Sequence, residues 1–247
     1  MDRLVYVAMN GAKQSVSRQA ATAHNLANAS TDGFRSLYHV ARAVPVLGPG
    51  TATRTFAVDS TAGSNFAPGP IDRTDRVLDV AVEGRGWIAV EGPDGREAYT
   101  RSGALEINAN GQLQTKAGLN VMGEGGPITI PPDSRVTIAR DGTVSTIPTV
   151  GAPNITNTVG RIKLVDPAEA SLQRGEDGLF RMRDGTVAPA DPNVAVASGA
   201  LERSNVNVVA AITEIINHGR QFELQVRMLQ SADQNARSAA QVLAISA

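Results

Sequence analysis

A heptad repeat near the C-terminus is the feature that most constrains this chain. Between about residues 207 and 243, one set of positions recurs in alternating steps of four and three without a slip; it comprises Val208, Ile212, Ile215, Gly219, Phe222, Val226, Leu229, Asp233, Ala236, Ala240 and Leu243. This spacing keeps one face of a helix turned toward a partner. At about 1.5 Å per residue the helix would be roughly 55 Å long, which is more than a domain of this size can cover. The sequence therefore predicts a long helix that needs partners.

The N-terminal segment, from about Asp2 to Asn28, predicts a second helix. Its small and apolar residues also recur in steps of three and four; they are Val5, Met9, Ala12, Val16, Ala20, Ala23 and Ala27. Because alanine buries little area, this stripe cannot hold a lone helix folded, but it lets a neighbouring helix come close. Gly33 predicts the end of the segment, since glycine readily adopts the left-handed conformation that follows a helix.

The middle of the chain has the composition of β-strands. Short runs rich in branched apolar residues are separated by turn dipeptides; the turns are centred on Asp94-Gly95, Asn110-Gly111, Asp141-Gly142 and Asp184-Gly185. Short strands with frequent glycine turns are typical of an irregular barrel or sandwich.

These zones predict an α+β fold. Residues 1–35 and 199–247 are expected to form a coiled-coil stem from the two terminal helices. Residues 36–75, which are rich in proline and glycine, are expected to be an extended linker or hairpin arm. Residues 76–198 are expected to form a central all-β domain with its return linker.

The sequence offers no arrangement of residues suited to catalysis. The chain has no cysteine, which excludes disulfides, thiolate metal sites and cysteine nucleophiles. There is no Gly-x-Ser-x-Gly elbow for a serine nucleophile, and Asp72, Asp75 and Asp79 lack the spacing of a calcium loop. We therefore predict that the chain is not an enzyme and has no catalytic, cofactor or metal site.

Charge and hydropathy also exclude some partners. The formal net charge of -1 does not suit a general nucleic-acid binder. The apolar run from Leu4 to Met9 is shorter than the core of a secretory signal, and no stretch approaches the roughly 20 apolar residues of a membrane span. These signals predict no direct membrane insertion and no cleaved signal peptide.

Four sequence blocks resemble the flagellar rod and hook protein family. They run through most of the chain in the family's order: Asn25-Leu26-Ala27-Asn28-Ala29-Ser30-Thr31-Asp32-Gly33-Phe34-Arg35, then Leu78 to Trp87, then Tyr99-Thr100-Arg101-Ser102-Gly103 with Asn110-Gly111-Gln112-Leu113, and finally Gly199 to Asn207. Trp87 stands where the family often has phenylalanine. The opening Met1 to Tyr6 and the segment Arg220 to Gln225 are most similar to the proximal-rod members.

The resemblance implies a structural subunit of the proximal rod, the hollow shaft that transmits torque and houses the export channel. It implies type III export without a cleaved signal, a periplasmic location in the basal body, and an inner domain made of the two terminal helices. The implied partners are other rod proteins and copies of the chain, with basal-body ring proteins as a further candidate. The residues expected at the assembly interface are Val5, Met9, Ala12, Val16, Leu26, Phe34, Ile212, Ile215, Phe222, Val226, Leu229 and Leu243.

Three other interpretations remain open from the sequence. The chain could be a distal-rod subunit of the same family. It could be a non-flagellar adaptor that dimerises through its heptad helix. It could also be an enzyme that acts on the cell wall, in which case it would release soluble fragments from purified peptidoglycan.

Overall fold

The computed structural model describes residues 2–45, 55–59, 63–149 and 156–245. The chain divides into two units. Residues 1–29, 36–65 and 206–247 form the first, which we call the helical unit. Residues 30–35 and 66–205 form the second, the β unit. The chain therefore passes from one unit to the other several times, and each unit is assembled from segments far apart in sequence.

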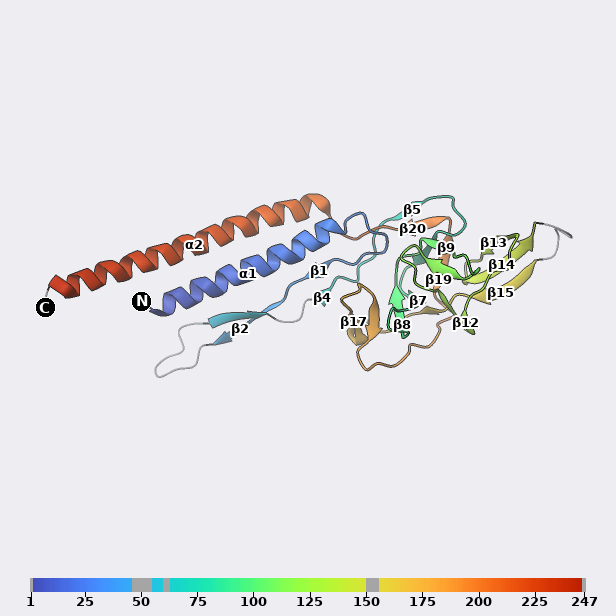
Figure 1. Ribbon diagram of the computed structural model, residues 1–247, viewed down its shortest axis with the longest axis horizontal. Coiled ribbons are helices and arrows are strands. Elements are labelled where there is room, and N and C mark those ends of the chain that lie inside the picture. The colour runs from blue at the N-terminus through green and yellow to red at the C-terminus, as the bar shows by residue number, and fades with distance from the viewer. Residues whose placement is uncertain (1, 46–54, 60–62, 150–155, 246–247) are drawn as a thin grey trace. The chain divides into compact units, whose positions relative to one another are not determined.

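Two antiparallel helices dominate the helical unit (Figure 1). They are α1, Asp2–Ala27, and α2, Val208–Ile245, and they pack side by side. With its 38 residues, α2 is about 57 Å long. The two terminal helices and the central β-rich region confirm the predicted α+β class. Coiled-coil pairing of the helices stays a prediction.

The same unit contains a β arm that lies against α1. Its strands are β1 (Leu37–Tyr38), β2 (Ala41–Pro45), β3 (Thr55–Asp59) and β4 (Gly63–Ser64). Strand β1 pairs with β4, and β2 pairs with β3, both antiparallel. The side chain of Asn25 on α1 joins the arm as a peptide group would: its Nδ2 donates to the Leu37 carbonyl and its Oδ1 accepts from the Leu37 N–H, each at 2.8 Å.

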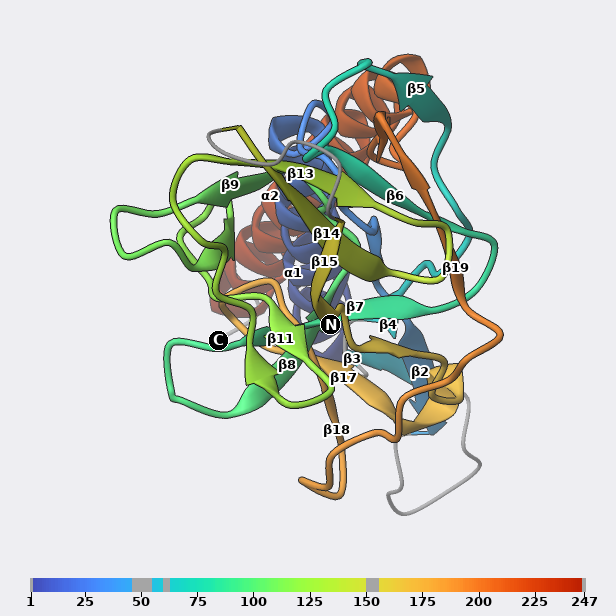
Figure 2. The same ribbon diagram turned by 90° about the vertical axis from the view of Figure 1, so that its right-hand side faces the viewer.

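The β unit is built from short strands in small sheets, seen end-on in Figure 2. Its strands are β5 (Ile71–Arg73), β6 (Val80–Glu83), β7 (Trp87–Glu91), β8 (Glu97–Thr100), β9 (Leu105–Ile107), β10 (Leu113–Thr115), β11 (Met122–Gly123), β12 (Gly126–Pro127), β13 (Ser134–Ile138), β14 (Thr143–Pro148), β15 (Asn157–Arg161), β16 (Leu164–Val165), β17 (Leu172–Arg174), β18 (Phe180–Met182), β19 (Ala195–Ser198) and β20 (Ala200–Glu202). A single 3-10 turn covers Glu169–Ser171.

Two sheets organise this unit. The larger has five strands in the order β16-β7-β8-β18-β17, and the other has three, β13-β14-β15. The last two strands of the β unit pair with its first two strands. Strand β19 pairs with β6, and β20 pairs with β5. The predicted turns are present; at Asn110-Gly111, for example, the glycine has φ +78, which an L side chain rarely adopts.

The core of the β unit consists of branched aliphatic side chains from strands β6 to β19, with Val80, Ile88, Leu105, Leu113 and Val144 completely buried. A second, aromatic cluster joins Trp87, Tyr99 and Phe180. The ring centroids of Trp87 and Phe180 are 4.6 Å apart. Both clusters lie within the β unit.

Candidate assembly interface

The outward face of α1 carries the larger apolar side chains of that helix. Val5, Tyr6, Met9 and Val16 are all exposed, and Met9 is 55% exposed. Three of them, Val5, Met9 and Val16, belong to the stripe that the sequence predicts. They are spaced along one side of the helix, although Ala12, which lies between Met9 and Val16 in the same stripe, is buried.

The outward faces of α2 are also apolar. The exposed residues are Val208, Val209, Ile212, Ile216, Phe222, Leu224 and Met228. Val209 is 75% exposed, which is far more than a branched aliphatic side chain usually shows in a monomeric protein.

The face between the helices has the opposite character. The residues of α1 that are buried are Ala8, Ala12, Gln14, Ser15 and Thr22, and those of α2 are Ala211 and Ala232. Small and polar side chains therefore lie inside the helical unit, while the larger apolar ones lie outside. Such a pair buries little apolar area, so the hydrophobic effect contributes weakly to holding it together.

Two alanines of α2 that precede positions of the predicted seam are buried. Ala211 and Ala232 are each 5% exposed, whereas their neighbours Ile212 and Asp233 are exposed. Alanines allow the helices to approach closely, and Asp233 instead forms a surface ion pair with Arg237 at 2.8 Å. The heptad positions Ile215, Val226 and Leu229 are partly exposed, so the pairing of the heptad face stays a prediction.

The structure places the predicted interface residues in three environments. Those exposed are Val5, Met9, Val16, Ile212 and Phe222. Those partly exposed are Leu26, Ile215, Val226 and Leu229. Ala12 and Phe34 are buried within the chain, and the side chain of Leu243 lies outside the described residues.

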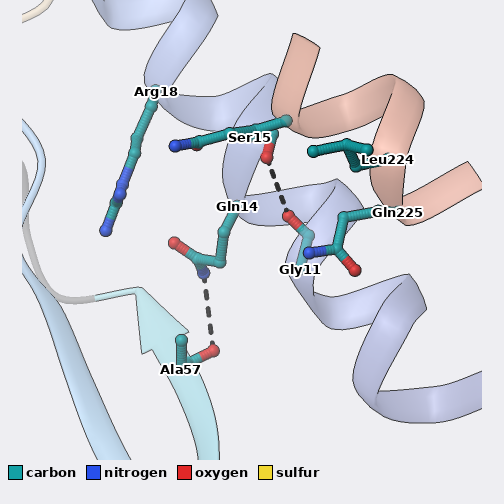
Figure 3. A pocket seen from close by; sticks show the side chains of 8 residues that line it. Gly11, Gln14, Ser15, Arg18, Ala57, Leu224 and Gln225 are labelled. Carbon is teal, nitrogen blue, oxygen red and sulfur yellow. Dashed lines mark hydrogen bonds between the residues drawn. The ribbon is translucent and has the colours of Figure 1, made fainter. Parts of the chain in front are cut away.

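A pocket of about 340 Å³ lies where α1, α2 and β3 meet (Figure 3). Glutamine side chains line much of it; the full lining is Gly11, Gln14, Ser15, Arg18, Ala57, Gln221, Leu224 and Gln225. Gln14 Nε2 donates to the Ala57 carbonyl at 3.4 Å, and Ser15 Oγ donates to the Gly11 carbonyl at 3.1 Å. The lining contains Ser15 but neither a histidine nor a carboxylate that could act as its base.

A buried ionic cluster lies in the β unit, and we call its three charged residues the clasp: Arg35, Arg101 and Glu202. Arg35 Nη1 is 2.7 Å from Glu202 Oε1, and Arg101 Nη1 is 2.9 Å from Glu202 Oε2. All three side chains are at most 5% exposed. Burial lowers the pKa of Arg101, while the nearby Glu202 opposes that shift. Buried charges of this kind are stable only when they are paired, as they are here.

The indole of Trp87 covers the clasp. The guanidinium carbons of Arg35 and Arg101 lie 5.9 and 5.3 Å from the centroid of its ring. Among the described residues, Arg35 Nε and Nη2 and Arg101 Nε find no hydrogen-bond acceptor, and the electron-rich face of the indole is their neighbour. The aromatic ring therefore stabilises the positive charge that one carboxylate leaves unbalanced.

The backbone around the clasp is packed so closely that glycine is required at two places. Gly33 has φ +69, and a Cβ there would collide with the backbone of Arg101 and Ser102. A Cβ on Gly69 would collide with the Arg203 carbonyl. The Gly69 N–H donates to Glu202 Oε1 at 2.9 Å, and the Gly33 N–H donates to the Glu202 carbonyl at 2.7 Å.

Sequence reasoning missed the clasp. Arg35, Arg101 and Glu202 are charged, and charged residues are almost always expected at the surface. One feature of the sequence could have indicated these residues: each of them lies in a different one of the sequence blocks that resemble the rod and hook protein family. The structure also explains Phe34, whose ring lies under the Arg174 guanidinium at 4.6 Å instead of facing solvent.

In the part of the chain that the structure describes, no three acidic, histidine or cysteine side chains gather as metal ligands would. Neither α1 nor α2, over their described residues, is both long and apolar enough to cross a membrane.

Comparison with known proteins identifies three matching family profiles, in chain order. The profile described as "Flagella basal body rod protein" matches residues 5–35. "Flagellar hook protein FlgE/F/G D1 domain" matches residues 81–146, and "Flagellar basal body rod FlgEFG protein C-terminal" matches residues 197–242.

Full-length relatives agree with these profiles. The chain is 46% identical over 252 residues to the flagellar basal-body rod protein FlgF of Salmonella typhimurium, with 100% of both chains covered. It is 33% identical to FlgF of Caulobacter vibrioides, with 98% of each chain covered. The rod protein FlgG of Agrobacterium fabrum is 31% identical, with 95% of this chain and 97% of that protein covered. With this likeness along its whole length, the chain belongs to the FlgF family of flagellar basal-body rod proteins.

Proposed function

We propose that this chain is a structural subunit of the proximal rod of the bacterial flagellar basal body, and that it polymerises through the outward faces of α1 and α2. The observation that carries the proposal is the inverted packing of the helical unit. Alanine, serine and threonine lie between the helices, while Met9, Val16, Ile212 and Val209 face outward. Apolar faces of this extent mark surfaces that bind other proteins.

Assembly would bury the apolar surfaces that the single chain leaves exposed. Neighbouring subunits bury the exposed strips, and each added subunit offers a new pair of strips to the next. A contact between two different faces, repeated from subunit to subunit, builds a ring or an open helical tube. The coiled-coil pairing predicted from the heptad would then form between helices of neighbouring subunits, and the tube would transmit torque and enclose the export channel.

The remaining features of the proposal follow from the family. We propose that the chain is exported without a cleaved signal peptide and acts in the periplasmic rod. Its partners would be copies of itself and other proximal and distal rod proteins, with ring proteins of the basal body as further candidates. No catalytic role is proposed, and in the pocket between α1, α2 and β3 Ser15 has no base beside it. The higher identity to FlgF than to FlgG relatives favours the proximal over the distal rod.

The test is complementation of a strain that lacks this chain. Ile212→Asp places a charge on the outward face of α2 and is expected to abolish swimming and to leave isolated basal bodies without the subunit. Asn217→Asp is the matched control, because Asn217 is an exposed polar residue on the same helix, and it is expected to swim normally. The fluorescence of Trp87, the only tryptophan, reports whether the β unit remains folded in each variant. Normal swimming with Ile212→Asp would contradict the proposed interface.

A further inference from the structure

The chain passes between the helical unit and the β unit at four peptide junctions: 29/30, 35/36, 65/66 and 205/206. Any force carried by the backbone from one unit to the other must pass through these junctions. On the β-unit side, they lead directly into the segments 30–35, 66–73 and 199–205, which are the segments that surround the clasp.

Direct hydrogen bonds tie the junction segments to one another. Arg35 Nη1 donates to the Ala67 carbonyl at 2.8 Å, and Asn205 Nδ2 donates to the same carbonyl at 2.9 Å. The Asn205 N–H in turn donates to the Phe34 carbonyl at 3.3 Å. Residues next to three of the four junctions are thus linked to each other inside the β unit.

Further contacts join these segments to the sheets. Arg174, at the end of β17, donates from Nη1 to the Arg35 carbonyl at 2.9 Å and covers the ring of Phe34. Arg101 follows β8 in the five-stranded sheet, and its Nη2 donates to the Gly84 carbonyl at 2.8 Å. Through Glu202, then, the segment that arrives from α1 and the segment that leaves toward α2 are both bonded to the same rigid sheet.

We propose that the clasp is the mechanical anchor of this subunit: the site where force carried by the chain between the two units is transferred to the β core. Glu202 is the positioning residue at its centre, since it alone contacts Arg35, Arg101 and the backbone of Gly69. The purpose of such an anchor rests on the proposed function, because only a rod subunit must carry torque. The anchor itself is a property of the single chain and can be tested apart from the rod.

Without the clasp, the junction segments would be held by weak elements. Ribbon β5–β20 is only three residues long on each strand, and all three residues of β5 are exposed. The three residues of β20 are buried, but a two-stranded ribbon this short is marginal by itself. The clasp adds two buried ion pairs that share Glu202, so segment 199–205 cannot leave without breaking both, and the attraction between opposite charges is stronger when they are shielded from water.

The experiment is single-molecule pulling on the full chain, which has no cysteine of its own to interfere with attachment. In the junction geometry, handles are attached through Asn28→Cys and Asn207→Cys, so that force enters the β unit through the junction segments. In the reference geometry, handles at Asn110→Cys and Glu176→Cys, both exposed, load the β unit without passing through the clasp.

Arg35→Met is the diagnostic variant, because it removes one arm of the clasp and leaves Arg101 paired with Glu202. In the junction geometry, its unfolding rate at fixed force is expected to rise at least about tenfold. In the reference geometry, its unfolding rate is expected to stay within about twofold of the unchanged chain. A contribution to general stability alone would accelerate unfolding equally in both geometries, and that result would overturn the proposal.

Two further variants guard against ambiguous outcomes. Lys163→Met removes another largely buried ion pair, with Glu97 at 2.8 Å, that lies away from the junction segments, and it is expected not to accelerate unfolding selectively in the junction geometry.

Arg174→Met is a milder change at the anchor and is expected to act in the same direction as Arg35→Met. If both anchor variants leave the β unit unfolded without force, the clasp serves folding rather than force transfer and the proposal fails. The pulling experiment uses the single chain and tests the anchor alone. Swimming of the Ile212→Asp strain tests the assembly interface, so failure of one proposal can be told from failure of the other.

Discussion

Arg35 and Glu202 form an ion pair with a nitrogen–oxygen distance of 2.7 Å, and both side chains are almost completely buried. The two residues come from opposite ends of the chain, one from the segment after α1 and the other from the strand that precedes α2. A buried pair so far apart in sequence can form only when both segments have taken their final paths across the β unit.

Substitutions in the clasp should differ in cost according to the charge that they leave unpaired. Glu202→Gln leaves two buried guanidinium groups without a carboxylate and is expected to cost roughly 3–5 kcal/mol of unfolding free energy. Arg35→Met leaves the Arg101–Glu202 pair intact and is expected to cost less, about 1–3 kcal/mol. Urea unfolding followed by Trp87 fluorescence measures both, since this ring lies against the clasp.

Arg96→Met serves as the control for this comparison. Its ion pair with Asp94 is exposed, so its loss should change stability by less than about 1 kcal/mol. If Glu202→Gln were no more costly than Arg96→Met, the clasp would not contribute to the stability of the β unit.

Gly33→Ala should be far more costly than Gly84→Ala, although both glycines have φ +69. The left-handed backbone costs an alanine about 1–2 kcal/mol at either position. At Gly84 no atom lies within 4 Å of the new methyl group, whereas at Gly33 the methyl group would collide with the backbone of Arg101. Thermal unfolding should therefore show a loss for Gly33→Ala that exceeds that of Gly84→Ala by at least about 2 kcal/mol. Equal losses would show that the backbone at Gly33 has room to move.

Gly219→Ala should stabilise α2 in the free chain. Gly219 is inside the helix, and a Cβ there would meet no atom within 4 Å, so the substitution gains roughly 0.5–1 kcal/mol of helix propensity without a clash. Amide hydrogen exchange along α2 measures the effect. Faster exchange in the variant would contradict this expectation. In cells, a loss of swimming by this more stable variant would show that a neighbouring subunit packs against Gly219.

Stability should fall at high pH because of Tyr99. Burial raises the pKa of its phenol from 10.0 to about 12, while its hydrogen bond with the Ala188 N–H, at 2.7 Å, acts in the opposite direction. Between these values the unfolded chain has lost the proton and the folded chain retains it, so the free energy of unfolding decreases as pH rises from about 10 toward 12 and is unaffected by this group at lower pH.

Tyr99→Phe tests this assignment. The variant should lose that part of the pH dependence, while a constant cost of about 1–3 kcal/mol remains at neutral pH because the Ala188 N–H is left without its acceptor. Urea unfolding of both chains at pH 8 to 11 makes the comparison. An unchanged slope above pH 10 in the variant would assign the effect to another group.

The amino-acid pattern alone determined the two terminal helices, the β-rich middle and the turns at glycine, such as Asn110-Gly111. These features depend on local periodicity and on backbone preferences that each residue carries with it. The exposed strip of Val5, Met9 and Val16 was predictable for the same reason.

Only the tertiary structure decided which face of α2 is covered and where the charged residues lie. Ala211 is buried, whereas the adjacent Ile212, which belongs to the heptad set, is exposed. Arg35, Arg101 and Glu202 come together because segments distant in sequence cross at one place in the β unit. Their burial is favourable only once all three are paired, and that mutual dependence is a property of the folded arrangement, which no single segment carries.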